Sequence, residues 1–153
     1  MHDRILAIDF GLRRFGLAVS DALGLTAQGL ATLERTRIQS DLERIRGLIA
    51  EYSVTRVILG HPLSKSGNVT SMSTQVAEFA ERLRKRLAVE VLLWDERLTS
   101  SEANRMLRES GIGLEKRRKA VDRVAATLLL QGYLDRQSFE RDHPAGNPSG
   151  ENE

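Results

Sequence analysis

Two apolar runs near the start of the chain, separated by only four residues, restrict the possible folds more than any other feature. Residues 4–10 and 15–21 are mostly aliphatic or aromatic, and Gly11-Leu12-Arg13-Arg14 joins them. Such runs predict buried strands, and a connection this short makes the two strands pair antiparallel. A weaker strand at 28–34 extends the pair to a three-stranded meander.

Helical and extended patterns alternate along the rest of the chain. We expect Ser40 to cap the first helix, and Thr99 with Glu102 forms a capping-box signature. The predicted elements are a helix at 40–52, a strand at 56–60, a helix at 72–87, a strand at 89–94, and helices at 99–109 and 117–136. Strand–helix–strand crossovers add parallel strands to the meander. The sequence therefore predicts an α/β domain with a mixed five-stranded sheet, an antiparallel meander plus two parallel strands, and helices on both faces.

The composition predicts one globular domain at residues 1–136 and a short tail. The chain has 153 residues, of which 41% are hydrophobic and 29% charged, as is ordinary for a chain that buries a core. Residues 137–153 are acidic and hold few apolar side chains, so we expect a disordered tail. Cysteine is absent, which excludes disulfides and thiolate metal sites. No apolar run reaches the roughly 18 residues of a membrane span, so we expect a cytoplasmic protein without membrane attachment.

Three acidic residues stand out because each ends or interrupts an apolar segment. Asp9 ends the first strand, Glu96 follows the strand at 89–94, and Asp122 lies within the apolar pattern of the last helix. A carboxylate in such a place is costly unless something compensates its charge. Asp95 and Glu96 are adjacent, so in a strand they point to opposite faces, and we choose Glu96 as the partner of Asp9.

The chemistry of these carboxylates predicts a divalent-metal site. Hard oxygen ligands from three separate elements suit Mg²⁺ or Mn²⁺. Two such ions roughly 4 Å apart activate a water and stabilise the leaving oxygen of a phosphodiester. Taken singly, two of the acids also fit simpler interpretations: Asp9 as a turn aspartate, and Asp122 as a partly exposed acid paired with neighbouring basic residues. The histidines offer no competing site, because His2 and His143 are terminal and His61 has no histidine or cysteine partner near it in the sequence.

Basic residues gather at two places that suit phosphate. Arg13 and Arg14 lie at the tip of the predicted hairpin, and positions 103–123 hold seven arginines and lysines against three acidic residues. Arginine binds phosphate through paired hydrogen bonds. The alternative for both places is a solvated surface with no partner.

Four motifs occur in order along the chain: DFGLRRFGLA from Asp9, GHPL from Gly60 with Gly67 beyond it, DERLTS from Asp95, and KAVDRVAA from Lys119. With them the chain resembles the YqgF/RuvX family of Holliday-junction-resolvase-like proteins and pre-16S rRNA nucleases over residues 4–134. The resemblance implies an RNase H-like fold, with Asp9, Glu96 and Asp122 as the metal-binding catalytic carboxylates. Ala125 stands where related junction resolvases carry a further acidic residue.

The resemblance implies a metal-dependent nuclease acting on nucleic acid, either structured RNA or branched or single-stranded DNA. Ribosomal RNA precursor is the usual substrate assigned to the family. In that function the phosphate-binding residues would be Arg13, Arg14, Arg97, Lys116, Arg117, Arg118 and Lys119. We expect a monomer or a weak homodimer.

Two other functions stay open at this point, and a third fits the chain less well. Cleavage of four-way DNA junctions would need a symmetric dimer, because two opposed strands must be cut. A non-catalytic RNA-binding maturation factor would keep the basic surface and not need the carboxylates. The actin-like ATPase fold shares the Asp-x-Gly hairpin, but it needs a second domain to enclose a nucleotide, and 153 residues leave no room for one.

Overall fold

The structure is a computed structural model that describes residues 3–61, 68, 70–95 and 114–142, without the side chains at positions 95 and 114–123. One sheet holds the strands β1 (Arg4–Phe10), β2 (Arg14–Ser20), β3 (Ala27–Glu34), β4 (Val54–His61) and β5 (Glu90–Asp95). Their order is β3-β2-β1-β4-β5. β2 pairs antiparallel with β1 and β3, and β4 pairs parallel with β1 and β5. The predicted meander plus two parallel strands is confirmed.

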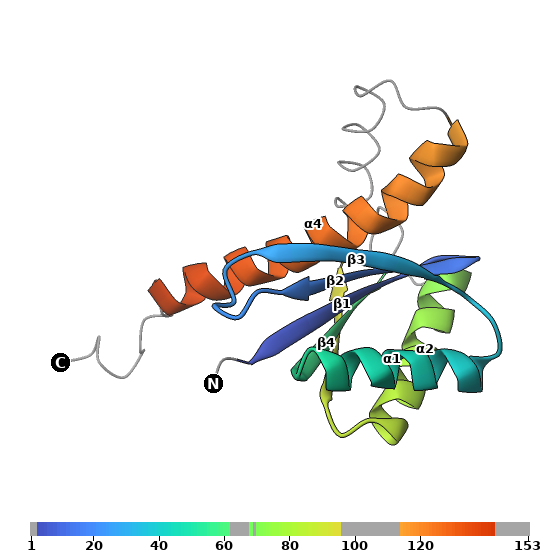
Figure 1. Ribbon diagram of the computed structural model, residues 1–153, viewed down its shortest axis with the longest axis horizontal. Coiled ribbons are helices and arrows are strands. Elements are labelled where there is room, and N and C mark those ends of the chain that lie inside the picture. The colour runs from blue at the N-terminus through green and yellow to red at the C-terminus, as the bar shows by residue number, and fades with distance from the viewer. Residues whose placement is uncertain (1–2, 62–67, 69, 96–113, 143–153) are drawn as a thin grey trace.

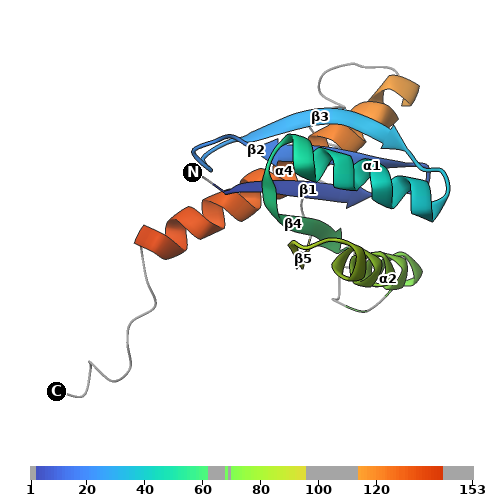
Figure 2. The same ribbon diagram turned by 60° about the horizontal axis from the view of Figure 1, so that its bottom comes forward.

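Helices cover both faces of this sheet (Figure 1). α4 (Leu114–Asp142) lies along one face, where it contacts β1, β2 and β3. α1 (Ile38–Glu51) and α2 (Ser71–Arg86) lie together on the opposite face, as the turned view shows (Figure 2). Each strand residue therefore points either toward α4 or toward α1 and α2.

Alternation along the strands divides the core into two clusters. On one side, Leu6, Ile8 and Phe10 of β1 pack with the apolar stripes of α1 and α2. On the other side, Ile5 and Ala7 of β1 pack against α4. The α4 residues of this second cluster are Ala126, Leu129, Leu130, Tyr133 and Leu134. Because β1 alternates regularly, Asp9 belongs to the α4 face.

The prediction that Ser40 caps the first helix is wrong. The N-cap is Arg37, whose side chain makes no capping hydrogen bond. Asp41, only 2% exposed, anchors the β3–α1 connection instead. It accepts hydrogen bonds from the Thr36 backbone at 3.0 Å, the Thr36 hydroxyl at 2.8 Å and the Arg44 guanidinium at 2.6 Å. Burial alone would raise the pKa of Asp41, but these bonds from Thr36 and Arg44 hold it below its ordinary value.

The last helix is longer at both ends than the predicted 117–136, since α4 extends from Leu114 to Asp142. An ion pair between Arg136 and Glu140, one turn apart at 3.0 Å, supports the added C-terminal turn. The folded part therefore continues past the predicted domain end at 136. The rest of the predicted tail and the predicted helix at 99–109 lie outside the described residues. No helix in the described part is both long and apolar enough to cross a membrane.

Candidate active site

Asp9 is the next-to-last residue of β1, and glycines are its neighbours in both adjacent strands. In the antiparallel ladder Asp9 pairs with Gly16 of β2. In the parallel ladder Ile8 pairs with Leu59, so the next step brings Asp9 level with Gly60 of β4. Asp9 is 9% exposed, and neither glycine places a side chain beside it. On this face the Asp9 side chain is therefore bordered by α4 and by the edge of the sheet, not by side chains at the paired positions of β2 and β4.

The end of β5 reaches the same edge, because β1, β4 and β5 run parallel. Trp94 of β5 packs edge-on against Tyr133 of α4, with ring centroids 5.1 Å apart, so Trp94 lies on the α4 face. Asp95, in register with His61, takes the alternate position in the strand. Glu96 is the next residue and lies outside the described part. Its predicted convergence with Asp9 stays a prediction.

Gln131 and Leu134 of α4 contact the opposite edge of the sheet. Gln131 accepts a hydrogen bond from the backbone N–H of Ala27 at 2.9 Å, where β3 begins. Leu134 and Ile5 line one cavity beside the start of β1. Going back along α4 from these contacts therefore leads toward the edge that holds Asp9, as Figure 1 shows for the long axis of the helix.

The helix has the length needed to bring Asp122 to the level of Asp9. From Leu134 back to Asp122 an α-helix rises about 18 Å, and from Ile5 to Asp9 a strand rises about 13 Å. Asp122 has a helical backbone one turn before the fully buried Ala126. The side chain of Asp122 is outside the description, so its part in a site stays a prediction.

The two arginines of the hairpin differ in their surroundings. The Arg14 side chain is 16% exposed, and its Nε lies 3.9 Å from Oε1 of Glu34. Arg13 is exposed and forms no ion pair with any residue that the structure describes. Arg13 is therefore more accessible than Arg14 to a phosphate from solvent. The remaining predicted phosphate contacts, Arg97 and the side chains at 116–119, lie outside the description.

Sequence reasoning missed Arg35, which follows β3 and holds the hairpin loop. Its Nη1 donates hydrogen bonds to the carbonyls of Gly11 at 2.9 Å and Leu12 at 3.1 Å, and its backbone N–H donates to the carbonyl of Arg13 at 2.8 Å. The guanidinium carbon lies 4.3 Å from the centroid of the Phe10 ring. No local sequence pattern marks this role, because the contacts cross more than twenty positions of the chain.

The described residues allow only a partial test of the predicted metal site. Among them, no three histidine, cysteine, aspartate or glutamate side chains gather closely enough to hold an ion. Of the predicted trio, the description includes the side chain of Asp9 alone. The donor chemistry of the trio, carboxylate oxygens without nitrogen or sulfur, fits Mg²⁺ or Mn²⁺.

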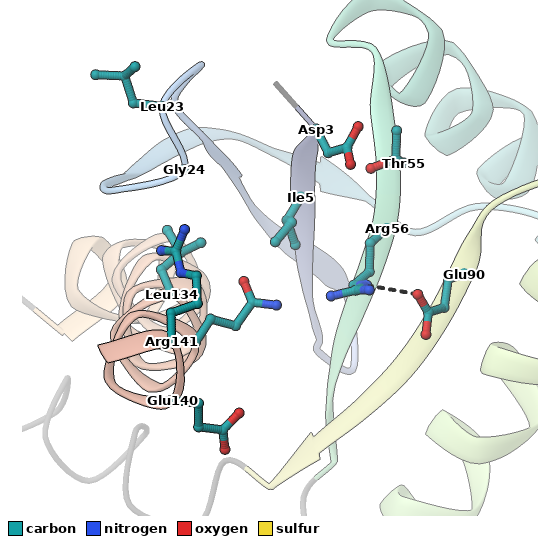
Figure 3. Close-up of a pocket in the computed structure, with 11 residues that line it drawn as sticks. Asp3, Ile5, Leu23, Gly24, Thr55, Arg56, Glu90, Leu134, Glu140 and Arg141 are labelled. Atoms are coloured by element: carbon teal, nitrogen blue, oxygen red, sulfur yellow. Dashed lines mark hydrogen bonds and ion pairs between the residues drawn. The ribbon is translucent and has the colours of Figure 1, made fainter. Parts of the chain in front are cut away.

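A cavity of about 680 Å³ lies at the far edge of the sheet from Asp9 (Figure 3). Inside it, Arg56 donates hydrogen bonds to Oε2 of Glu90 at 2.9 Å and to the Tyr133 hydroxyl at 2.7 Å. Burial alone would lower the pKa of Arg56, but the bonds to Tyr133 and Glu90 raise it above its ordinary value. The charged guanidinium thereby links α4 to β4 and β5, which is a structural role.

Solved structures of junction resolvases share this fold. RuvC of T. thermophilus, in complex with a Holliday junction substrate, matches with a TM-score of 0.56 at 16% identity, over 90% of this chain and 97% of that chain. The fowlpox virus resolvase with its Holliday junction DNA matches with a TM-score of 0.53 at 12% identity, over 88% and 98%. At these identities the likeness establishes the fold alone. That fold is the RNase H-like fold of RuvC-type resolvases.

Sequence comparison then identifies the family within this fold. The RuvX family model, described as Holliday junction resolvase, matches residues 3–136. A protein of Koribacter versatilis is 49% identical over 144 residues, 94% of each chain. A protein of Halalkalibacterium halodurans is 42% identical over 139 residues, 90% of this chain and 99% of that one. Both relatives carry the provisional name pre-16S rRNA nuclease. The chain belongs to the RuvX family of nucleases, as its four motifs predicted.

Proposed function

We propose that this protein is a metal-dependent nuclease that hydrolyses phosphodiester bonds in the precursor of 16S ribosomal RNA. The observation that carries the proposal is the position of Asp9. It is a buried carboxylate at the edge where three parallel strands end, it lies on the face that α4 covers, and it has glycines on both sides. In α/β sheets this edge is where ligands bind.

The two other carboxylates join Asp9 by extension of the described elements. Side chains of a strand alternate between its two faces. If β5 continues by two residues beyond Trp94, Glu96 lies on the face of Asp9 and Asp95 on the other. Continuing the stripe of α4 back from Ala126 by one turn puts Asp122 on that face as well. In this proposal Asp9, Glu96 and Asp122 hold Mg²⁺ or Mn²⁺.

The chain's own residues then have separate tasks. The chemistry that divalent ions would supply at this site is an activated water and neutralisation of charge on the leaving oxygen. The carboxylates would fix where that chemistry takes place, and the packing of α4 on β1 and β2 would hold Asp122 in place relative to Asp9. Arg13, with Arg97 and the basic positions 116–119, holds phosphates of the substrate and positions the scissile bond.

The names of the relatives support ribosomal RNA precursor as the substrate, and this substrate implies action in the cytoplasm. A second candidate is cleavage of four-way DNA junctions, which the RuvC-type fold favours. The two differ in assembly. Junction cleavage needs two active sites related by symmetry, whereas a monomer suffices for cutting a single RNA strand.

A substrate panel separates these functions. Purified protein is given a 16S precursor fragment, a four-way DNA junction and a single-stranded DNA of matched length, each with Mg²⁺, Mn²⁺ or EDTA. We expect metal-dependent cleavage of the precursor, abolished in Glu96→Gln and retained in Asp95→Asn, the matched control one residue away. Cleavage of the junction alone would make the second candidate correct. Binding of RNA without cleavage of any substrate would instead support a non-catalytic maturation factor.

A further inference from the structure

The hairpin between β1 and β2 has its backbone carbonyls fixed from one side. Arg35 bonds all three carbonyls of Gly11, Leu12 and Arg13, two through its guanidinium and one through its backbone N–H. The guanidinium is held in turn over the Phe10 ring, 4.3 Å from its centroid. Phe10 belongs to the core cluster of α1 and α2, so Arg35 approaches the loop from that side of the sheet.

This arrangement determines where two N–H groups of the loop point. The described residues have no cis peptide bond, and in a trans peptide the C=O and N–H bonds point in opposite directions. The carbonyls of Gly11 and Leu12 point at the Arg35 guanidinium, so the N–H groups of Leu12 and Arg13 point away from it. The guanidinium lies on the α1 and α2 side of the sheet, and the opposite side is the one to which Asp9 belongs. Within the described part of the chain, neither N–H donates a hydrogen bond to a protein acceptor.

Two successive N–H groups aimed at one side form a cavity of positive partial charge, which binds anions. Arg13 adds a full positive charge at the same loop, and its exposed side chain has no ion pair in the described part of the chain. We propose that the N–H groups of Leu12 and Arg13, with the Arg13 side chain, form a phosphate-binding subsite next to Asp9. Arg35 is its positioning residue: it touches no phosphate and acts by orienting the two peptides.

The identity of the anion as a backbone phosphate of nucleic acid rests on the proposed function. The subsite itself does not, because inorganic phosphate presents the same oxygens. A phosphate held there would be a neighbour of the scissile one, since the loop follows Asp9 by only a few residues. The subsite would therefore affect substrate affinity and the placement of the cut strand more than the chemical step.

Amide resonances test the subsite without any turnover. ¹⁵N-labelled protein in EDTA is titrated with a six-nucleotide RNA and, separately, with inorganic phosphate. We expect the Leu12 and Arg13 amides to move downfield and saturate with both probes, and to move in the same direction. Unchanged Leu12 and Arg13 amides at RNA concentrations that shift other residues would overturn the proposal.

Removing a single N–H tests it in the working enzyme. Replacing Leu12 by its α-hydroxy acid keeps the side chain and exchanges the N–H for an ester oxygen. We expect KM for the substrate to rise about tenfold, as for loss of a hydrogen bond to a charged group, with kcat nearly unchanged. The same exchange at Leu23, an exposed leucine in the β2–β3 turn at the far edge, is the control and leaves both constants unchanged. An unchanged KM for the Leu12 ester would contradict the subsite.

If Arg35 positions the loop, Arg35→Gln should have the same effect as the Leu12 ester. The control is Arg46→Gln, at an arginine of α1 whose side chain is 63% exposed. We expect Arg35→Gln alone to raise KM and to abolish the phosphate response of the Leu12 and Arg13 amides. Loss of kcat with an unchanged amide response would show that Arg35 acts otherwise. These outcomes are distinct from failure of the proposed function, because a protein that cleaves nothing would still show the phosphate response.

Discussion

Asp9 of β1 stands directly opposite Gly16 of β2 in the antiparallel ladder. Both residues belong to the face that α4 covers, and a side chain at position 16 would stand beside the carboxylate. The pairing suggests that glycine is needed here for the ligand of Asp9 rather than for backbone conformation, since Gly24 is the one glycine with positive φ in the described part of the chain.

Gly16→Val is therefore expected to impair the metal site. The added side chain would crowd Asp9, so we expect Mn²⁺ affinity to fall at least about tenfold and cleavage to fall with it. Gly29→Val is the control, because Gly29 is exposed in the adjacent strand β3. Isothermal titration with Mn²⁺ measures the affinity, and circular dichroism confirms the fold. Equal Mn²⁺ affinities in Gly16→Val and wild type would show that position 16 does not border the site.

Asp41 is expected to make stability depend on pH. Its folded-state pKa lies below its ordinary value, so its contribution is present above the ordinary pKa of an aspartate and is lost as pH falls through the folded pKa. We expect Asp41→Asn to lower the free energy of unfolding by about 2 kcal/mol at pH 7, by loss of charge-assisted bonds. The difference should shrink toward zero in strong acid. Urea titrations at several pH values measure it, and a gap independent of pH would refute the assignment.

Arg117 and Arg118 lie in α4, at helical positions just before Asp122. Neutralising both is expected to weaken nucleic-acid binding for all sequences alike and to reduce the slope of log K against log salt by about 1.5 to 2. Mn²⁺ affinity should not change. Fluorescence anisotropy at several salt concentrations gives the slope. A slope equal to that of wild type would place the substrate elsewhere.

We expect the residues beyond the C-terminal end of α4 to be dispensable, and the last turns of α4 to contribute to stability. Deleting residues 143–153 is expected to change neither cleavage nor stability, because this segment holds few apolar side chains and its net negative charge would repel phosphates. Deleting from Gln137 also removes its hydrogen bond to the Tyr133 hydroxyl at 3.0 Å, so we expect a loss of about 1 kcal/mol of stability. Thermal melts and cleavage rates of both truncations check this. Lost cleavage in the shorter truncation, with the fold intact, would contradict it.

Local patterns were sufficient to predict the five strands and the mixture of antiparallel and parallel pairing in the sheet. The short connection between β1 and β2 required a hairpin, and the later crossovers required parallel strands. The alternation that predicts opposite faces for Asp95 and Glu96 also divides the core residues of β1. One set packs against α4 and the other against α1 and α2. The position of Asp9 at the edge of the sheet could therefore be predicted without coordinates.

Contacts between residues far apart in the sequence could not be predicted from local patterns. Ser40 looked like a cap, but Asp41 anchors α1 through Thr36 and Arg44. Arg35 reaches the hairpin loop across the chain, and only the folded arrangement of β2 and β3 brings it there. The pairing of Asp9 with Gly16 likewise depends on the register of β1 against β2. The length of the turn limits the possible registers but does not determine which one forms.

We expect Asp9 to act in chemistry and not in substrate binding. Asp9→Asn removes a negative charge and leaves the basic residues intact, and affinity for nucleic acid depends mostly on phosphate neutralisation. The variant should bind precursor RNA at least as tightly as wild type. Asp135→Asn, at an exposed position of α4 near the opposite edge, is the matched control and should behave as wild type in both respects.

The most direct measurement is the single-turnover cleavage rate of precursor RNA by Asp9→Asn, taken in Mg²⁺ or Mn²⁺ beside the affinity of the same preparation for the RNA. We predict a rate at least about a thousandfold below wild type, as for loss of a metal ligand that supports several kcal/mol of transition-state stabilisation, with affinity unchanged or higher. A full wild-type rate in Asp9→Asn would contradict the assignment of the active site.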